Sequence, residues 1–189
     1  MLYDNAEISR AMLAGYQVTG DDRYAAAARR TFEFVERELT HPEGASESHS
    51  EARRTESRGG FYSTLDAQSD GEEGKFYVWT PQGIRDAVDD PTAADLFCDR
   101  FGVTESGNFE GDTVLTSSES IGDLADEYEM SEVEVEETVE QARKEVFAAR
   151  AERVRPRRDE KVLAGWNGLL ISALAEGALV LGDDRYADL

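Results

Sequence analysis

Acidic residues are concentrated between two aromatic runs, and their side chains and spacing could support acid–base catalysis. The runs cover residues 61–64 and 76–79, and the segment between them carries Asp66, Asp70, Glu72 and Glu73. Glycoside cleavage needs one carboxyl group to protonate the leaving oxygen and a second to activate water or attack the sugar. We therefore predict Asp66, Glu72 and Glu73 as catalytic residues of a carbohydrate-active site.

Side chains along the two aromatic runs alternate between two faces, as they do in a β-strand. This alternation predicts a β-ribbon over residues 59–80. Aromatic side chains on such a ribbon can stack on a sugar ring, so Tyr77 and Trp79 are predicted to bind substrate. The alternative is an acidic surface hairpin whose aromatic side chains only fill a helical core.

A calcium loop is a weaker interpretation of the same segment. Asp66, Asp70 and Gly71 match the opening of an EF-hand loop, but Gln68 stands at its third position. Tyr77 occupies the twelfth position, where a bidentate glutamate is required. We predict no metal site and no cofactor.

A second polar segment precedes an apolar helix near the end of the sequence. Asp159 and Lys161 lead into this helix, and Trp166 and Asn167 lie in its first turns. All four are predicted to contact a sugar-like ligand. The alternative is a capped helix start that follows an ion-paired linker.

The sequence GDDRYA occurs twice, at residues 20–25 and 182–187, each time after an alanine- and leucine-rich stretch. Glycine ends one helix, aspartate caps the next, and tyrosine begins a new apolar face. The repeat predicts helical hairpins that stack on one another, because one hairpin cannot bury its own apolar face. The predicted fold class is mainly α.

The domain layout follows from these patterns. We predict one domain of stacked or ring-closed helical hairpins over residues 1–189, which the family resemblance described below implies is a partial α/α toroid. We expect the chain to be a fragment of something longer or to need a partner. Its predicted parts are a first hairpin (1–40), a mobile linker (41–58), the β-ribbon (59–80), helices with a short strand (81–154), and a cavity-lining segment with a truncated hairpin (155–189).

The charge balance is strongly acidic and dispersed along the chain. Asp and Glu number 41 against 20 Lys and Arg, giving a formal charge of -21. Such a surface predicts a halophilic protein whose self-repulsion is screened by salt, and a localised patch for a basic partner is the competing interpretation. Nucleic acid is excluded as a partner, because phosphate binding needs a basic stripe. The one basic run, at residues 150–158, is predicted to form local ion pairs.

Other classes of site are disfavoured by composition. Cys98 is the one cysteine and lies in an apolar setting, so we expect a buried thiol. His41 and His49 both fall in the linker, which disfavours an epimerase mechanism with paired histidines. We find no long apolar window and no signal-peptide pattern, and we therefore expect a cytoplasmic protein with no membrane span.

Four strings of residues carry a family resemblance: MLYDNA, GGFYSTLDAQSDGEEGKFYVWT, GNFEG and RPRRDEKVLAGWNGLLISALA. Their types and order resemble the YyaL-like, spermatogenesis-associated thioredoxin-domain-containing proteins. The resemblance implies a helical toroid similar to six-hairpin glycosidases and to the N-acylglucosamine 2-epimerase fold. We expect the family's thioredoxin-like domain to be absent from this sequence, because it has no CxxC motif and no thioredoxin-like βαβ pattern.

Two functions remain open at this stage. The first is a carbohydrate-active or carbohydrate-binding domain whose loop carboxylates act as acid and base. The second is a non-catalytic binding or interaction scaffold. The predicted partners are a sugar-like small molecule and either a second copy in a two-fold homodimer or the remainder of a longer parent chain.

Overall fold

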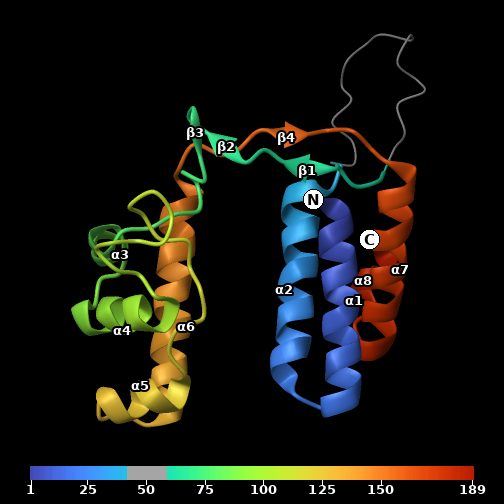
Figure 1. The fold of residues 1–189 in the computed structure, drawn as a ribbon. Helices are drawn as coiled ribbons and strands as arrows, with labels where there is room; N and C mark the ends of the chain where they lie inside the picture. The colour runs from blue at the N-terminus through green and yellow to red at the C-terminus, as the bar shows by residue number, and fades with distance from the viewer. Residues whose placement is uncertain (42–58) are drawn as a thin grey trace. The chain divides into compact units, whose positions relative to one another are not determined.

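The computed structural model describes residues 1–41 and 59–189, which form eight helices and four two-residue strands (Figure 1). The chain is therefore mainly α-helical with a small β insertion, as predicted. It divides into two compact units: unit 1 comprises Met1–Asp66 and Arg157–Leu189, and unit 2 comprises Ala67–Pro156. The predicted mobile linker lies outside the described residues except for His41, and so does His49.

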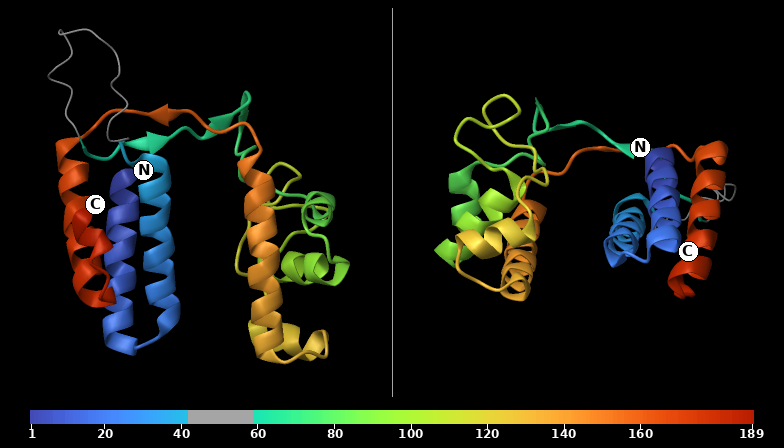
Figure 2. Two further views of the ribbon diagram at one scale, coloured as in Figure 1. Left: turned by 180° about the vertical axis from the view of Figure 1, so that it is seen from behind. Right: turned by 60° about the horizontal axis from the view of Figure 1, so that its bottom comes forward.

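Two helical hairpins build unit 1. The first consists of α1 (Leu2–Thr19) and α2 (Asp22–Leu39), and the second of α7 (Ala164–Leu181) and the one-turn α8 (Arg185–Asp188). Helix α1 lies between α2 and α7, as Figures 1 and 2 show. Each end of the chain therefore contributes a pair of helices to unit 1, and the second pair ends with the four-residue α8.

The repeated GDDRYA motif makes the same turn in both hairpins. Gly20 ends α1 with a left-handed φ of 69°, and its counterpart in the second copy has a φ of 64°. Asp21 then accepts hydrogen bonds from the backbone N–H and the guanidinium of Arg23. Asp183 and Arg185 repeat these contacts. The motif therefore specifies a helix end, a cap and a local ion pair in six residues.

The strands form two separate antiparallel pairs. In unit 1, β1 (Thr64–Leu65) pairs with β4 (Arg158–Asp159), so that two segments distant in sequence are joined near the start of α1. In unit 2, β2 (Gln68–Ser69) pairs with β3 (Glu72–Glu73).

The predicted ribbon is wrong in its pairing, because the two aromatic runs do not pair with each other. Phe61 instead forms a bridge with Thr40, and Trp79 forms one with Thr113. The backbone folds into a turn after Gly74, whose carbonyl accepts the N–H of Tyr77 at 2.7 Å. The hairpin lies wholly within the acidic segment, which had been predicted as a loop.

Unit 2 contains four helices: α3 (Pro81–Ala87), α4 (Pro91–Phe101), α5 (Ile121–Glu127) and α6 (Glu132–Ala151). Ser131 and Glu134 form a capping box at the start of α6. Helix α6 buries Val135, Val139, Ala142 and Val146, which share one face of the helix.

Helix α7 differs from expectation in its apolar character. By length and composition it could cross a membrane, although no such window was recognised in the sequence. Core helices of water-soluble proteins pass the same test, so the property is weak evidence. Five residues of α7 are buried within unit 1, while Leu179 is 85% exposed.

Candidate functional site

A tight hairpin holds the acidic segment of unit 2. Asp70 and Gly71 join its strands with φ values of 52° and 83°, the left-handed conformation of a type I′ turn. Lys75 Nζ donates hydrogen bonds to Glu72 Oε1 at 2.7 Å and to Asp70 Oδ2 at 2.9 Å. These bonds raise the pKa of Lys75 above its ordinary value, and the bond that Glu72 accepts contributes most. The ammonium therefore stays charged and links the two carboxylates.

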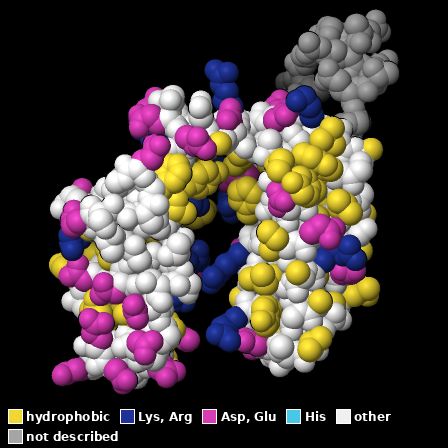
Figure 3. Space-filling model, viewed as in Figure 1, with side chains coloured by type: hydrophobic (Ala, Val, Ile, Leu, Met, Phe, Trp, Pro, Cys, Tyr) yellow, Lys and Arg dark blue, Asp and Glu magenta, His cyan; other side chains and the backbone are white. Residues whose placement is uncertain are grey.

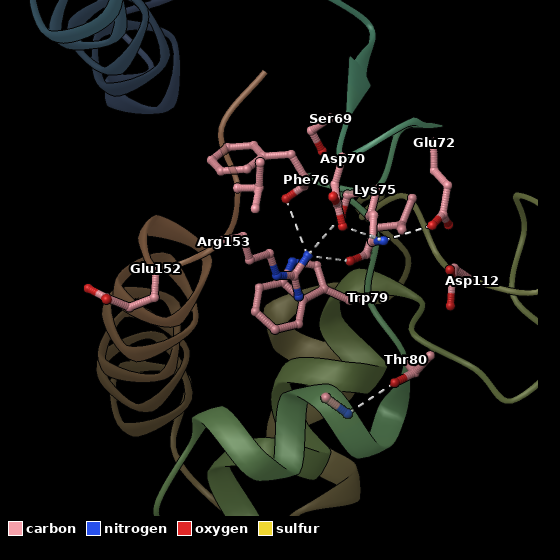
Figure 4. Close-up of a pocket in the computed structure, with 13 residues that line it drawn as sticks. Ser69, Asp70, Glu72, Lys75, Phe76, Trp79, Thr80, Asp112, Glu152 and Arg153 are labelled. Atoms are coloured by element: carbon pink, nitrogen blue, oxygen red, sulfur yellow. Dashed lines mark hydrogen bonds and ion pairs between the residues drawn. The ribbon is translucent and has the colours of Figure 1, made fainter. Parts of the chain in front are cut away.

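A pocket of about 540 Å³ opens beside this hairpin (Figure 4). Its volume falls within the range of small-molecule sites. Polar groups come from the hairpin and from the end of α6, and apolar surface comes from the segment after Lys75. The lining residues are Ser69, Asp70, Glu72, Lys75, Phe76, Val78, Trp79, Thr80, Gly83, Asp112, Glu152, Arg153 and Val154.

Arg153 is the organising cation of this pocket. Its guanidinium carbon lies 3.8 Å from the centre of the Trp79 ring. Its Nη1 donates to three carbonyls within residues 75–78: to Val78 at 2.8 Å, to Phe76 at 3.2 Å and to Lys75 at 3.3 Å. One side chain at the end of α6 therefore fixes the backbone of the segment that carries Lys75 and Trp79.

Arg150 and Arg155 of the basic run also lie over an aromatic ring. Arg150 lies 5.5 Å from the centre of the Phe76 ring, and Arg155 lies 5.4 Å from the same ring. The predicted ion pairing holds for Arg158, which bonds Glu160 at 3.0 Å. The sequence analysis missed this stacking, although i, i+3 arginines at a helix end and the 76–79 aromatics were both visible signals.

The predicted catalytic carboxylates are divided between the two units. Asp66 is the last residue of the first segment of unit 1, and its N–H donates to Arg157 O at 2.7 Å. Glu72 and Glu73 both lie on β3 of unit 2, and of these two only Glu72 lines the pocket. The structure thus brings Glu72 together with Asp70 and Trp79, and it does not bring Glu73 to the same surface.

The predicted aromatic binding residues have different surroundings. Trp79 is 4% exposed, and Arg153 covers one face of its ring. Tyr77 is half-buried, makes an edge contact with Phe76, and does not line the pocket. Trp166 belongs to unit 1, where its ring lies 4.9 Å from that of Tyr3.

The remaining residues that were predicted to contact a sugar-like ligand form local contacts in unit 1. Lys161 Nζ donates to Asp159 Oδ2 at 3.0 Å, and this hydrogen bond lowers the pKa of Asp159 below its ordinary value. Asn167 is buried and bonds the backbone. Its Oδ1 accepts the N–H of Phe61 at 2.8 Å, and its Nδ2 donates to the carbonyls of Phe61 and Leu163 at 3.0 and 3.1 Å.

Replacing Asn167 with alanine is expected to destabilise unit 1 by about 2 kcal/mol. The change would leave the buried N–H and carbonyl of Phe61 without the partner that satisfies both. Thermal unfolding followed by circular dichroism would measure the loss. The exposed Ser172→Ala change on the same helix is the control, and equal stability of N167A and S172A would contradict the structural role.

Metal and thiol chemistry have little support among the described residues. Within the described ranges, 1–41 and 59–189, no group of three His, Cys, Asp or Glu side chains could hold a metal ion. In the segment considered as a calcium loop, the Lys75 ammonium bonds Asp70. Burial raises the pKa of the Cys98 thiol to about 11, so it stays protonated at neutral pH.

The sequence is similar to curated proteins along almost its whole length. It is 31% identical to spermatogenesis-associated protein 20 of Homo sapiens, 29% to that of Mus musculus and 28% to that of Rattus norvegicus, and each match covers 98% of this chain. The chain belongs to the spermatogenesis-associated protein 20 family. It spans 25% of the length of these relatives, and no family model matches it.

Proposed function

We propose that this member of the spermatogenesis-associated protein 20 family contributes part of a six-hairpin, glycosidase-like α/α toroid that binds a carbohydrate. The ligand would lie in the pocket beside the β2–β3 hairpin. The parallel placement of α1 and α7, each of which is followed by the same repeat, supports the toroid (Figure 1). Activity, substrate and partners of the whole protein belong to this proposal.

The observation that carries the proposal is the pair of carboxylates held by one ammonium at the edge of the pocket. Asp70 and Glu72 each leave one carboxylate oxygen outside their bond to Lys75. Neighbouring hydroxyl groups of a sugar can donate hydrogen bonds to such oxygens, while the Lys75 ammonium can donate to another oxygen atom of the same sugar. A polyhydroxylated ligand therefore matches the spacing of donors and acceptors better than an apolar one.

Binding is better supported than hydrolysis. The side chains of Asp70 and Glu72 are 57% and 67% exposed, and both share the same cation. A general acid of a glycosidase needs an environment that keeps its carboxyl group protonated, usually by burial. Neither side chain has that environment, so we assign the pair to ligand recognition.

Replacing Glu72 with glutamine is expected to weaken carbohydrate binding about tenfold, the effect of losing one charged hydrogen-bonding partner. The matched control is Glu73→Gln, the next residue on the same strand, which does not line the pocket. Isothermal titration calorimetry with neutral sugars, amino sugars and sugar acids would measure both variants. A ligand bound equally by E72Q and E73Q would remove the pocket from the proposal.

Two further results would redirect the assignment. Release of reducing sugar that is lost in E72Q would favour the hydrolytic function with Glu72 as a catalytic group. Failure of every carbohydrate to bind would favour the non-catalytic interaction scaffold.

A further inference from the structure

A third carboxylate lines the pocket beside the β2–β3 hairpin. Asp112 is half-buried, and its backbone exchanges hydrogen bonds of 2.9 Å in both directions with that of Phe109. The next residue, Thr113, exchanges backbone hydrogen bonds of 2.8 and 2.9 Å with Trp79, which lines the same pocket. The Phe109 ring in turn lies against Gly74, where a Cβ atom would be 3.1 Å from it. These contacts fix the backbone that carries the Asp112 carboxylate against the wall of the pocket.

The Asp112 side chain differs from the two carboxylates of the hairpin, because no cation is bonded to it. Asp70 and Glu72 both accept hydrogen bonds from the Lys75 ammonium. In the part of the chain that the structure describes, no hydrogen bond or ion pair reaches the Asp112 carboxylate. Partial burial of a charge without a bonded partner costs stability, since fewer water molecules solvate it. A cationic group of a ligand would offset this cost.

Both cations of the pocket are already engaged by the protein. Lys75 is shared between two carboxylates, and Arg153 donates to three carbonyls while its guanidinium covers the Trp79 ring. Burial lowers the pKa of Arg153 below its ordinary value, and the through-space attraction of Asp112 offsets only part of that change. An acidic ligand would therefore meet two cations that already have partners.

The charges around the pocket add up to an excess of carboxylates. Of its four acidic residues, Glu152 is exposed and is directed away from the other labelled side chains in Figure 4. The three that remain, Asp70, Glu72 and Asp112, outnumber the two cations. Because opposite charges attract most strongly where water is partly excluded, the pocket favours a cationic ligand and disfavours an anionic one.

We propose that the pocket binds a sugar that carries a protonated amino group, with the ammonium paired to Asp112 and hydroxyl groups donating to Asp70 and Glu72. The inference rests on the carbohydrate site proposed above, and it makes Asp112 the residue that determines the specificity of that site. An ammonium group has three donors and no acceptor, which suits a carboxylate that lacks a donor. N-acetylation turns the amine into a neutral amide, so the acetylated sugar would lose this pairing.

Matched sugars test the proposal on the unaltered chain. Glucosamine, galactosamine and mannosamine would each be compared by isothermal titration calorimetry with the N-acetyl derivative and with the parent neutral hexose. At least one amine is expected to bind about tenfold more tightly than both of its neutral counterparts, the gain from one charged hydrogen-bonded pair. Because salt screens this pairing, the titrations use the lowest potassium chloride concentration at which circular dichroism shows full helicity.

Replacing Asp112 with asparagine assigns the preference to one carboxylate. The change keeps the size of the side chain and removes its charge, so the preference for the amine is expected to disappear. The matched control is Glu110→Gln, an exposed acidic residue two positions earlier that does not line the pocket, and it should retain the preference. Circular dichroism would verify that both variants fold.

The possible results separate this inference from the function on which it rests. Equal affinities for an amine and its neutral counterparts, tighter binding of glucuronic acid, or a preference that persists in D112N would overturn the inference but not the carbohydrate site. Failure of every sugar to bind the unaltered protein would overturn both.

Discussion

Dilution from molar salt to about 0.01 M is expected to unfold most of the protein, because the Debye length grows from about 3 Å to about 30 Å. At high salt each acidic side chain interacts with its immediate neighbours only. At low salt the repulsion caused by 41 acidic residues against 20 basic ones extends over much longer distances. The compact state concentrates this charge, so repulsion lowers its stability relative to the expanded chain.

The ion pairs of the structure cannot offset that repulsion. Most lie between near neighbours in sequence and are exposed, as in the pairs of Arg23 with Asp21 and Lys161 with Asp159. Exposed pairs of this kind contribute little to stability, because water and salt screen them. Acidic side chains also gather on the visible face of unit 2 around α4 and α5, as Figure 3 shows.

A charge-reversal variant gives the test its control. Glu136 and Glu137 are exposed on α6 beyond its first turn, so changing both to lysine alters charge without removing the cap. The salt concentration at the midpoint of folding, followed by circular dichroism at 222 nm in potassium chloride, is expected to fall in E136K/E137K. Full helicity of the unaltered protein at about 0.01 M salt would reject the halophilic interpretation.

The helical part of the fold could be predicted because its signals are local. Gly20 in a left-handed conformation and the Asp21 cap are encoded within a few residues, and the same sequence at 182–187 gives the same turn. The capping box of Ser131 and Glu134 is equally local.

The strand pairing could not be predicted from alternation alone. Phe61 and Trp79 pair with Thr40 and Thr113, which lie well away from the ribbon that their own runs implied. The Asp70–Gly71 dipeptide was a readable hairpin signal, but the neighbouring acids favoured a loop interpretation. Partners distant in sequence leave no local trace, so tertiary contacts decided these pairings.

The candidate site could also be predicted only in part from the sequence. Glu72, Trp79 and the acidic segment were recognised from residue type, and the structure gathers Asp70, Glu72 and Trp79 around one pocket. Arg153 was not recognised, because its role depends on carbonyls about 75 residues earlier in the chain. The polarity of Asn167 led to the prediction that it contacts a ligand. In the structure its side-chain amide instead forms hydrogen bonds with the backbone of Phe61.

Replacing Arg153 with alanine is expected to destabilise unit 2 by about 3 kcal/mol. The change removes the donor shared by the carbonyls of Lys75, Phe76 and Val78. It also uncovers the Trp79 ring, which now has a guanidinium 3.8 Å from its centre. Because the same carbonyls belong to the segment that carries Lys75, the hairpin side of the pocket should lose its fixed geometry as well.

A Trp166→Phe background leaves Trp79 as the single tryptophan, so its fluorescence reports on unit 2 during urea unfolding. In that background R153A should unfold at a lower urea concentration than the parent. Arg153→Lys is the matched control, since it keeps the charge and lacks the planar fork, and it should fall between the two. If R153A unfolds at the same urea concentration as its parent, the three carbonyl bonds contribute nothing to the stability of unit 2.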